Sequence, residues 1–164
     1  MEIPDHFHFS HRRLVEFADT DLAGIMHFAN FFRFVESAEH AFFRSLGYRV
    51  HTATGAEHQG WPRLEVSCKY LKPARFEQTL EICLRIEELR TNSLRYSFWL
   101  FVADEPTRSL VATGSCSIIH VQLDTGTHAI RKSPIPEGLR ERFESFVGPV
   151  SEQLQGKPPA IRTI

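Results

Sequence analysis

Residues 16–31 read EFADTDLAGIMHFANF, and the organisation of the chain follows from this stretch. Asp19 and Asp21 stand in a turn-like run that reaches Gly24, directly before an aromatic segment with helical periodicity. Free N–H groups at the start of a helix stabilise negative charge. Two interpretations therefore fit the acids. Either they cap the turn, or one carboxylate attacks a carbonyl or activates water while the N–H groups hold the oxyanion.

A helix is predicted after this turn, over Phe28–Leu46, with Gly47 placed where a glycine ends a helix. Its apolar side chains form one broad arc, which predicts a deeply embedded helix. The arc contains Phe28, Phe31, Phe32, Val35, Ala38, Phe42, Phe43 and Leu46. Glu39 falls inside it, and because a buried carboxylate needs a partner, we expect Glu39 to pair at a subunit interface.

The remaining pattern predicts strands. One precedes the turn, over His6–Phe17, and a loop is expected over Tyr48–Trp61. Period-two alternation then predicts four strands, over Arg63–Leu71, Thr79–Leu89, Ser93–Ala103 and Leu110–Leu123. Short connections make them antiparallel neighbours. A short helix is predicted over Pro134–Val147. The expected fold class is α+β, with one long helix on a five-stranded antiparallel sheet, in a single domain over residues 1–147 followed by a loosely ordered tail over 148–164.

Composition narrows the function classes. The chain has 164 residues, with 19 Lys and Arg against 20 Asp and Glu, a net charge of −1. This balance argues against a nucleic-acid partner, and no apolar run is long enough to span a membrane. The cysteines Cys68, Cys83 and Cys116 show no metal-binding spacing and are expected as buried thiols in a reducing cytoplasm. No metal site is predicted.

The chain resembles the 4-hydroxybenzoyl-CoA thioesterase family of hotdog-fold proteins, and is similar to the acyl-CoA thioesterase encoded with the Tol-Pal envelope system. The resemblance rests on Asp19-x-Asp21, the turn at Ala23-Gly24 and Ile25 before an aromatic helix start. Further matches are Asn30 and Glu36, the run LKPAR (residues 71–75) and the turn LRTNS (residues 89–93). It covers residues 11–123, and more weakly up to Val147.

This resemblance implies a sheet wrapped around one long helix, in homodimers with active sites between subunits and in homotetramers of such dimers. It implies hydrolysis of an acyl- or aroyl-CoA, with no cofactor because coenzyme A is part of the substrate. Asp21 is the implied nucleophile or general base, and the backbone N–H of Phe28 the implied oxyanion donor. His27 either assists proton transfer or forms an aromatic wall. The implied substrate-binding residues are Gly24, Ile25, Asn30, Lys72, Arg75 and Arg90.

Two other functions stay open at this point. The turn that holds coenzyme A phosphates in the aromatic-substrate branch keeps only Arg90 here, which leaves room for a non-catalytic acyl-thioester binder. A hotdog hydratase or dehydratase would pair His27 with Glu36, although the local pattern does not resemble that of dehydratases.

Overall fold

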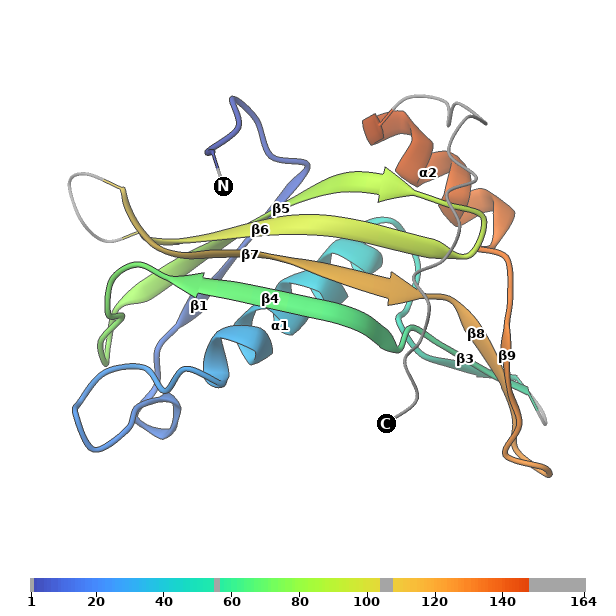
Figure 1. The fold of residues 1–164 in the computed structure, drawn as a ribbon, viewed down its shortest axis with the longest axis horizontal. Helices are drawn as coiled ribbons and strands as arrows, with labels where there is room; N and C mark the ends of the chain where they lie inside the picture. The colour runs from blue at the N-terminus through green and yellow to red at the C-terminus, as the bar shows by residue number, and fades with distance from the viewer. Residues whose placement is uncertain (1, 55–56, 104–107, 148–164) are drawn as a thin grey trace, which may run out of the picture.

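The computed structural model describes residues 2–54, 57–103 and 108–147. Its main sheet has five antiparallel strands in the order β1-β5-β6-β7-β4 (Figure 1). These strands are β1 (Phe9–Leu14), β4 (Arg63–Tyr70), β5 (Thr79–Leu89), β6 (Ser93–Val102) and β7 (Ser109–Ile119). The predicted five-stranded antiparallel sheet is confirmed. The prediction succeeded because apolar and polar residues alternate strictly along β4, β5 and β6, almost to the residue. The predicted tail, 148–164, lies outside the described residues.

A second, smaller sheet was not predicted. Its four antiparallel strands, in the order β2-β3-β8-β9, are β2 (Thr52–Thr54), β3 (Glu57–Gly60), β8 (Val121–Asp124) and β9 (Ile130–Lys132). The loop expected over residues 48–61 is therefore wrong where β2 and β3 form, since such short strands show no clear alternation. The long strand expected over residues 110–123 is divided at His120, whose N–H donates to the carbonyl of Asn92 at 2.8 Å.

Helix α1 (Asn30–Ser45) lies along one face of the main sheet, and α2 (Glu137–Val147) lies near the turn between β5 and β6 (Figure 1). The buried residues of α1 are Phe31, Phe34, Val35, Ala38, Glu39, Phe42 and Phe43. Two details of the predicted helix are wrong. Phe28 precedes the helix and is exposed, while Phe34, outside the predicted arc, is fully buried beneath the guanidinium of Arg13.

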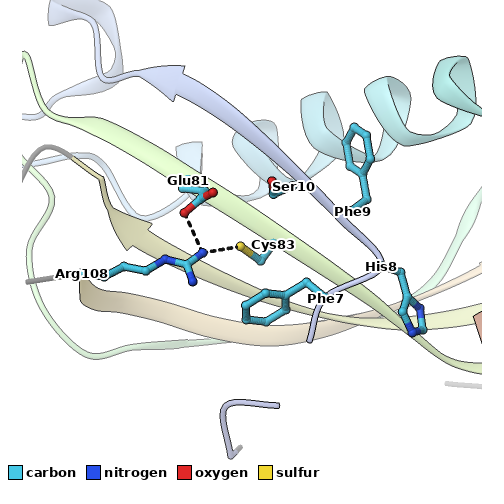
Figure 2. A pocket seen from close by; sticks show the side chains of 7 residues that line it. All are labelled: Phe7, His8, Phe9, Ser10, Glu81, Cys83 and Arg108. Carbon is cyan, nitrogen blue, oxygen red and sulfur yellow. Dashed lines mark hydrogen bonds and ion pairs between the residues drawn. The ribbon is translucent and has the colours of Figure 1, made fainter. Parts of the chain in front are cut away.

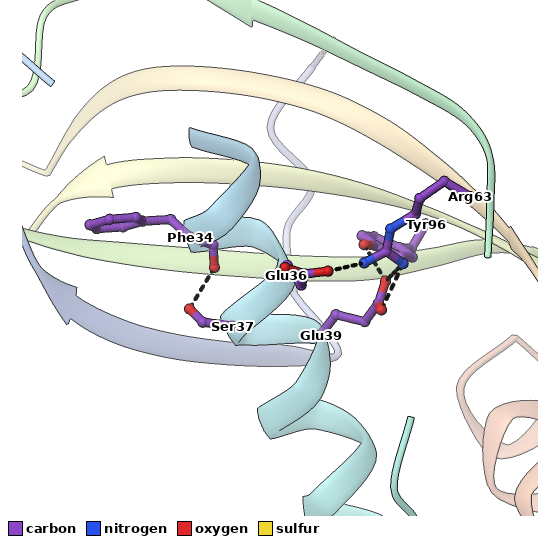
Figure 3. A network of polar contacts seen from close by, with 6 residues as sticks. All are labelled: Phe34, Glu36, Ser37, Glu39, Arg63 and Tyr96. Atoms are coloured by element: carbon purple, nitrogen blue, oxygen red, sulfur yellow. Dashed lines mark hydrogen bonds and ion pairs between the residues drawn. The ribbon is translucent and has the colours of Figure 1, made fainter. Parts of the chain in front are cut away.

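Glu39 pairs within its own chain, so its expected pairing at a subunit interface is wrong (Figure 3). Its carboxylate is 1% exposed and accepts hydrogen bonds from Arg63 Nη1 at 2.6 and 2.7 Å and from the Tyr96 hydroxyl at 2.5 Å. Burial, and then the Glu39 charge, raise the pKa of Tyr96 well above its usual value, so this hydroxyl remains a donor. Arg63 also lies 3.5 Å from Glu36, and the network fastens α1 to the start of β4.

Strand β4 departs most from its predicted burial. Its apolar side chains alternate as expected, but Leu64, Val66 and Tyr70 are exposed, Leu64 by 61%. In addition, β4 is the last strand of the sheet and pairs only with β7 among the described residues. One apolar row and one backbone edge of the sheet are therefore left open.

Candidate active site

The loop between β1 and α1 carries the predicted catalytic residues at one end of the main sheet (left in Figure 1). Two isolated bridges fix its path, one between Thr20 and Met26 within the loop and one between Ile25 and Arg75 in the β4–β5 connection. The N–H of Met26 adds a 2.8 Å hydrogen bond to the carbonyl of Ala74. The loop is thus folded back on itself and tied to the sheet.

The two acids of the loop have different surroundings. Asp19, 4% exposed, ends the short 3-10 helix η1 (Phe17–Asp19) and accepts a 3.0 Å hydrogen bond from the N–H of Glu16. Arg13 lies 3.7 Å from the same carboxylate. Asp21 is exposed, and one of its oxygens accepts from the N–H of Ala23 at 2.8 Å. Asp19 therefore supports the loop, while Asp21 presents a carboxylate to solvent.

Phe28 and His27 lie at the far end of the loop, in the turn that leads into α1. Among the described residues, the N–H of Phe28 has no hydrogen-bond acceptor, as an oxyanion donor requires. The His27 ring lies 4.4 Å from the Phe28 ring, and its Nδ1 accepts from the N–H of Ala29 at 3.3 Å. An accepting Nδ1 leaves the proton of a neutral imidazole on Nε2.

The predicted substrate-binding residues of the loop shape its backbone. Gly24 has φ 70°, the left-handed conformation that favours glycine, and its N–H closes the turn on the carbonyl of Asp21 at 3.0 Å. Ile25 is half-buried at its bridge to Arg75. The Asn30 amide donates to the carbonyl of Asp19 at 2.9 Å, which holds the loop against the helix.

The three predicted cations are not brought together. Arg75 lies beside Ile25, and its guanidinium has no ion-pair partner among the residues that the structure describes. Lys72 belongs to the same connection and donates to the Ser109 hydroxyl at 2.8 Å. Arg90 lies at the other end of β5, roughly 30 Å along the strand, and its Nε donates to Glu88 at 2.6 Å. Within one chain, Arg90 therefore lies at the opposite end of β5 from the connection that touches the loop bearing Asp21.

Tyr70 is a contributor that the sequence did not single out. Its hydroxyl donates to the carbonyl of Phe28 at 3.1 Å, and its ring lies 5.1 Å from that of Phe31. The last residue of β4 therefore fixes the turn that bears the Phe28 N–H. The sequence feature that could have identified Tyr70 is its position directly before the LKPAR run.

A cavity of about 580 Å³ lies elsewhere, between the N-terminal segment and β5, and contains none of the predicted site residues (Figure 2). Phe7, His8, Phe9, Ser10, Glu81, Cys83 and Arg108 line it. Arg108 bonds to Cys83 Sγ at 2.9 Å and pairs with Glu81 at 2.6 Å. Burial raises the pKa of Cys83 to about 11, so the thiol stays protonated and is a poor nucleophile.

The described residues contain no group of three or more metal-ligating side chains. They also contain no helix long and apolar enough to cross a membrane.

Comparison with known proteins shows the family. The family model described as "Thioesterase-like superfamily" matches residues 15–143. A 1,4-dihydroxy-2-naphthoyl-CoA hydrolase of Synechococcus elongatus is 27% identical over 134 residues, which cover 81% of this chain and 93% of the relative. An Aquifex aeolicus protein that bears the provisional name of an esterase is 36% identical over 98 residues, 58% of this chain and 74% of its own.

Solved structures agree. A 1,4-dihydroxy-2-naphthoyl-CoA thioesterase from Synechocystis superposes with a TM-score of 0.69 at 18% identity, covering 86% of this chain and 98% of that one, which shows a shared fold. A protein of Aquifex aeolicus gives a TM-score of 0.67 at 27% identity, covering 81% and 97%. The chain therefore belongs to the thioesterase-like superfamily, and the resemblance seen in its sequence is confirmed at that level.

Proposed function

We propose that this chain hydrolyses an acyl-CoA to the free acid and coenzyme A, with Asp21 as nucleophile or general base and the Phe28 N–H as oxyanion donor. Family membership makes it a thioester hydrolase. The observation that carries the residue assignment is that one braced loop bears both an exposed Asp21 carboxylate and a Phe28 N–H without an acceptor among the described residues. Glycine at position 24 lets the backbone of this loop turn sharply beside the carboxylate.

Either chemical route uses the same carboxylate. As nucleophile, an Asp21 oxygen attacks the carbonyl carbon, the C–S bond breaks, the thiolate leaves, and water hydrolyses the resulting anhydride. As general base, Asp21 takes a proton from water while the water oxygen attacks. In both routes the Phe28 N–H stabilises the oxygen that gains charge. His27 either assists proton transfer by donating an Nε2–H hydrogen bond to the leaving thiolate, which takes its proton from water, or forms an aromatic wall, and no cofactor is required.

We assign the acyl group to the aromatic class. The cyanobacterial relatives are named for an aromatic acyl group, 1,4-dihydroxy-2-naphthoyl. The rings of His27 and Phe28 offer an aromatic lining at the mouth of the loop. A 4-hydroxybenzoyl group belongs to the same class. Asn30, Lys72 and Arg75 complete the proposed substrate-binding set of this chain, in a reducing cytoplasm that suits its free thiols.

A second copy is proposed to complete the site. The open edge of β4 and its exposed apolar row suit antiparallel pairing with the same strand of another copy, with α1 as the helix around which each sheet wraps. That pairing would carry Arg90 of the partner subunit toward the end of the sheet that bears Asp21. Tetramers would join two such dimers.

The test is a set of thioesters with free thiol trapped by a chromogenic reagent. It holds benzoyl-, 4-hydroxybenzoyl-, 1,4-dihydroxy-2-naphthoyl-, short-chain and long-chain CoA. We expect one aroyl-CoA to be hydrolysed best and Asp21→Asn to lower kcat at least about 100-fold. Asp5→Asn, an exposed acid on the N-terminal segment, is the matched control and should keep wild-type kcat.

Other outcomes point to other functions. Full activity of a folded Asp21→Asn protein would remove Asp21 from the chemistry. Tight binding of an acyl-CoA without turnover would instead identify a binding protein, and hydration of an enoyl-CoA would identify a hydratase.

A further inference from the structure

Exposed phenylalanine gathers at the catalytic end of the molecule. The chain has 14 phenylalanines, all within the described residues, and only Phe17, Phe28 and Phe76 are exposed. Phe28 belongs to the site already described. Phe17 is 79% and Phe76 48% exposed, and their rings meet edge to face at 6.3 Å. Two aromatic rings exposed to water lose the free energy that their burial would release, so we expect a bound molecule to cover them.

The fold holds these two rings in place. Phe17 begins η1, whose ends are tied together by the reciprocal hydrogen bonds of Glu16 and Asp19. Phe76 lies in the connection between β4 and β5, where Glu77 adopts φ 66° although it is not glycine. The N–H of Glu77 donates to the carbonyl of Val15 at 2.9 Å, which joins the two segments. The two braced segments therefore hold the exposed rings at a right angle to each other.

A free cation lies next to the rings. Arg75 precedes Phe76 directly, is exposed, and its guanidinium has no ion-pair partner in the part of the chain that is described. Its backbone is held by the bridge to Ile25, and its N–H donates to the Gln78 side chain at 2.8 Å. Arg90, by contrast, donates a hydrogen bond to the Glu88 carboxylate, and this hydrogen bond lowers the pKa of Glu88.

We propose that Phe17 and Phe76 seat the adenine of coenzyme A and that Arg75 binds a phosphate group of the same nucleotide. This inference rests on the proposed function and adds the seat of the nucleotide to it. Adenine offers a flat π-face that stacks on aromatic side chains, and guanidinium is a strong phosphate ligand. Both seats lie on segments bridged to the loop that carries Asp21, so one substrate can occupy the nucleotide seat and the reaction site together.

The test compares two thioesters of one acyl group, benzoyl-CoA and benzoyl-pantetheine. The second thioester lacks the nucleotide. The Phe17→Ala/Phe76→Ala double variant should raise KM for benzoyl-CoA about tenfold, the loss expected when a base loses its stacking partner. Its kinetics on benzoyl-pantetheine should match those of the wild type. Arg75→Gln should act in the same direction, and Phe17→Trp/Phe76→Trp should restore a low KM. Ile130→Ala, an equally apolar and exposed residue on β9, is the control and should change neither ester.

Binding of free coenzyme A, measured by calorimetry against pantetheine, separates this inference from the proposed function. If the wild type hydrolyses neither ester, the proposed function fails, while weaker coenzyme A binding by the double variant would still support the nucleotide seat. Unchanged coenzyme A binding and unchanged KM in the double variant would overturn it. So would equal losses on both esters, or a changed oligomeric state with coenzyme A binding intact, which would make the two rings a contact between copies.

Discussion

His8 links the N-terminal segment to the sheet through its side chain as well as its backbone N–H, which donates to the carbonyl of Leu84 at 2.9 Å. Its Nδ1 accepts a 3.1 Å hydrogen bond from the N–H of Ile86, and its ring stacks on Phe146 of α2 at 5.1 Å. Burial lowers the pKa of His8, and the charge of Arg85 adds to that effect. A protonated imidazole has no acceptor lone pair at Nδ1, so protonation removes this hydrogen bond.

The sign of the resulting pH dependence follows. The folded protein holds His8 neutral at pH values where the unfolded chain, with a pKa near 6.5, already binds a proton. Its contribution to stability is therefore complete above about pH 6.5 and is lost as the pH falls toward the lower pKa of the folded state. We expect Tm to fall between pH 7.5 and 5.5 and His8→Gln, which keeps an acceptor but cannot titrate, to reduce that fall.

The matched control for this prediction is His51→Gln, at an exposed histidine that is not among the groups shifting the pKa of His8. It should leave the pH dependence of Tm unchanged. Part of the fall should survive in His8→Gln, because burial also lowers the pKa of His11. An unaltered fall in His8→Gln would mean that His8 does not couple protonation to folding.

Asp19 and Asp21 show how far single residues could be predicted. The sequence placed both acids in one turn and left two readings open for them. In the structure Asp19 is buried and hydrogen-bonded, so it stabilises the loop, whereas Asp21 is exposed. Spacing could not make this distinction, because it depends on the 3-10 turn that points one carboxylate inward. The partners of Glu39 were equally hidden, since Arg63 and Tyr96 lie far away in the sequence.

At the scale of elements, alternation predicted strands well when they were long and in the sheet interior. It fixed the bounds of β5, yet it missed β2 and β3, which have three and four residues. In β4 it predicted the correct strand but the wrong burial. Alternation reports which side chains share a face, and it cannot report whether another element covers that face.

Gly114 of β7 is required by the packing of three strands. A Cβ at this position would lie 2.0 Å from the carbonyl oxygen of Ser67 on β4 and 2.5 Å from the Phe98 ring on β6. Because a backbone oxygen cannot move without breaking the β4–β7 pairing, Gly114→Ala should lower the free energy of unfolding by about 3 kcal/mol. Chemical denaturation of both proteins measures this difference.

Gly60→Ala supplies the comparison, since a Cβ there meets no atom of the described residues within 4 Å. It should change the unfolding free energy by well under 1 kcal/mol, roughly the range of an uncrowded substitution. If Gly114→Ala were as mild as Gly60→Ala, β4 and β7 would have to be more widely spaced than the structure shows.

For the whole molecule, the sheet separates two groups of predicted site residues. The loop between β1 and α1, which carries Asp21 and Phe28, lies at one end, and the turn between β5 and β6, which carries Arg90, lies near α2 at the other (Figure 1). The sequence could predict each motif but not their separation, because chain order carries no distance along a sheet. One copy therefore holds the proposed reacting groups without the cation at residue 90, and the proposed pairing of β4 strands would supply that cation from a second copy.

Antiparallel pairing of two β4 strands around a two-fold axis would place the Arg63 end of one strand beside the Tyr70 end of the other. Tyr70 binds the Phe28 carbonyl, so such an interface would reach the proposed oxyanion donor. Val66→Glu sets two like charges into that interface, and a charge left unpaired in an interface costs several kcal/mol. We expect sedimentation to show a dimer or larger assembly for the wild type and a monomer for Val66→Glu. The kcat/KM of the variant should be at least about tenfold lower. Ile130→Glu, exposed on β9, should retain both assembly and activity. A wild-type monomer with full activity would show that one copy of the chain is sufficient. A Val66→Glu protein that still assembles and turns over substrate normally would show that β4 is not the interface between copies.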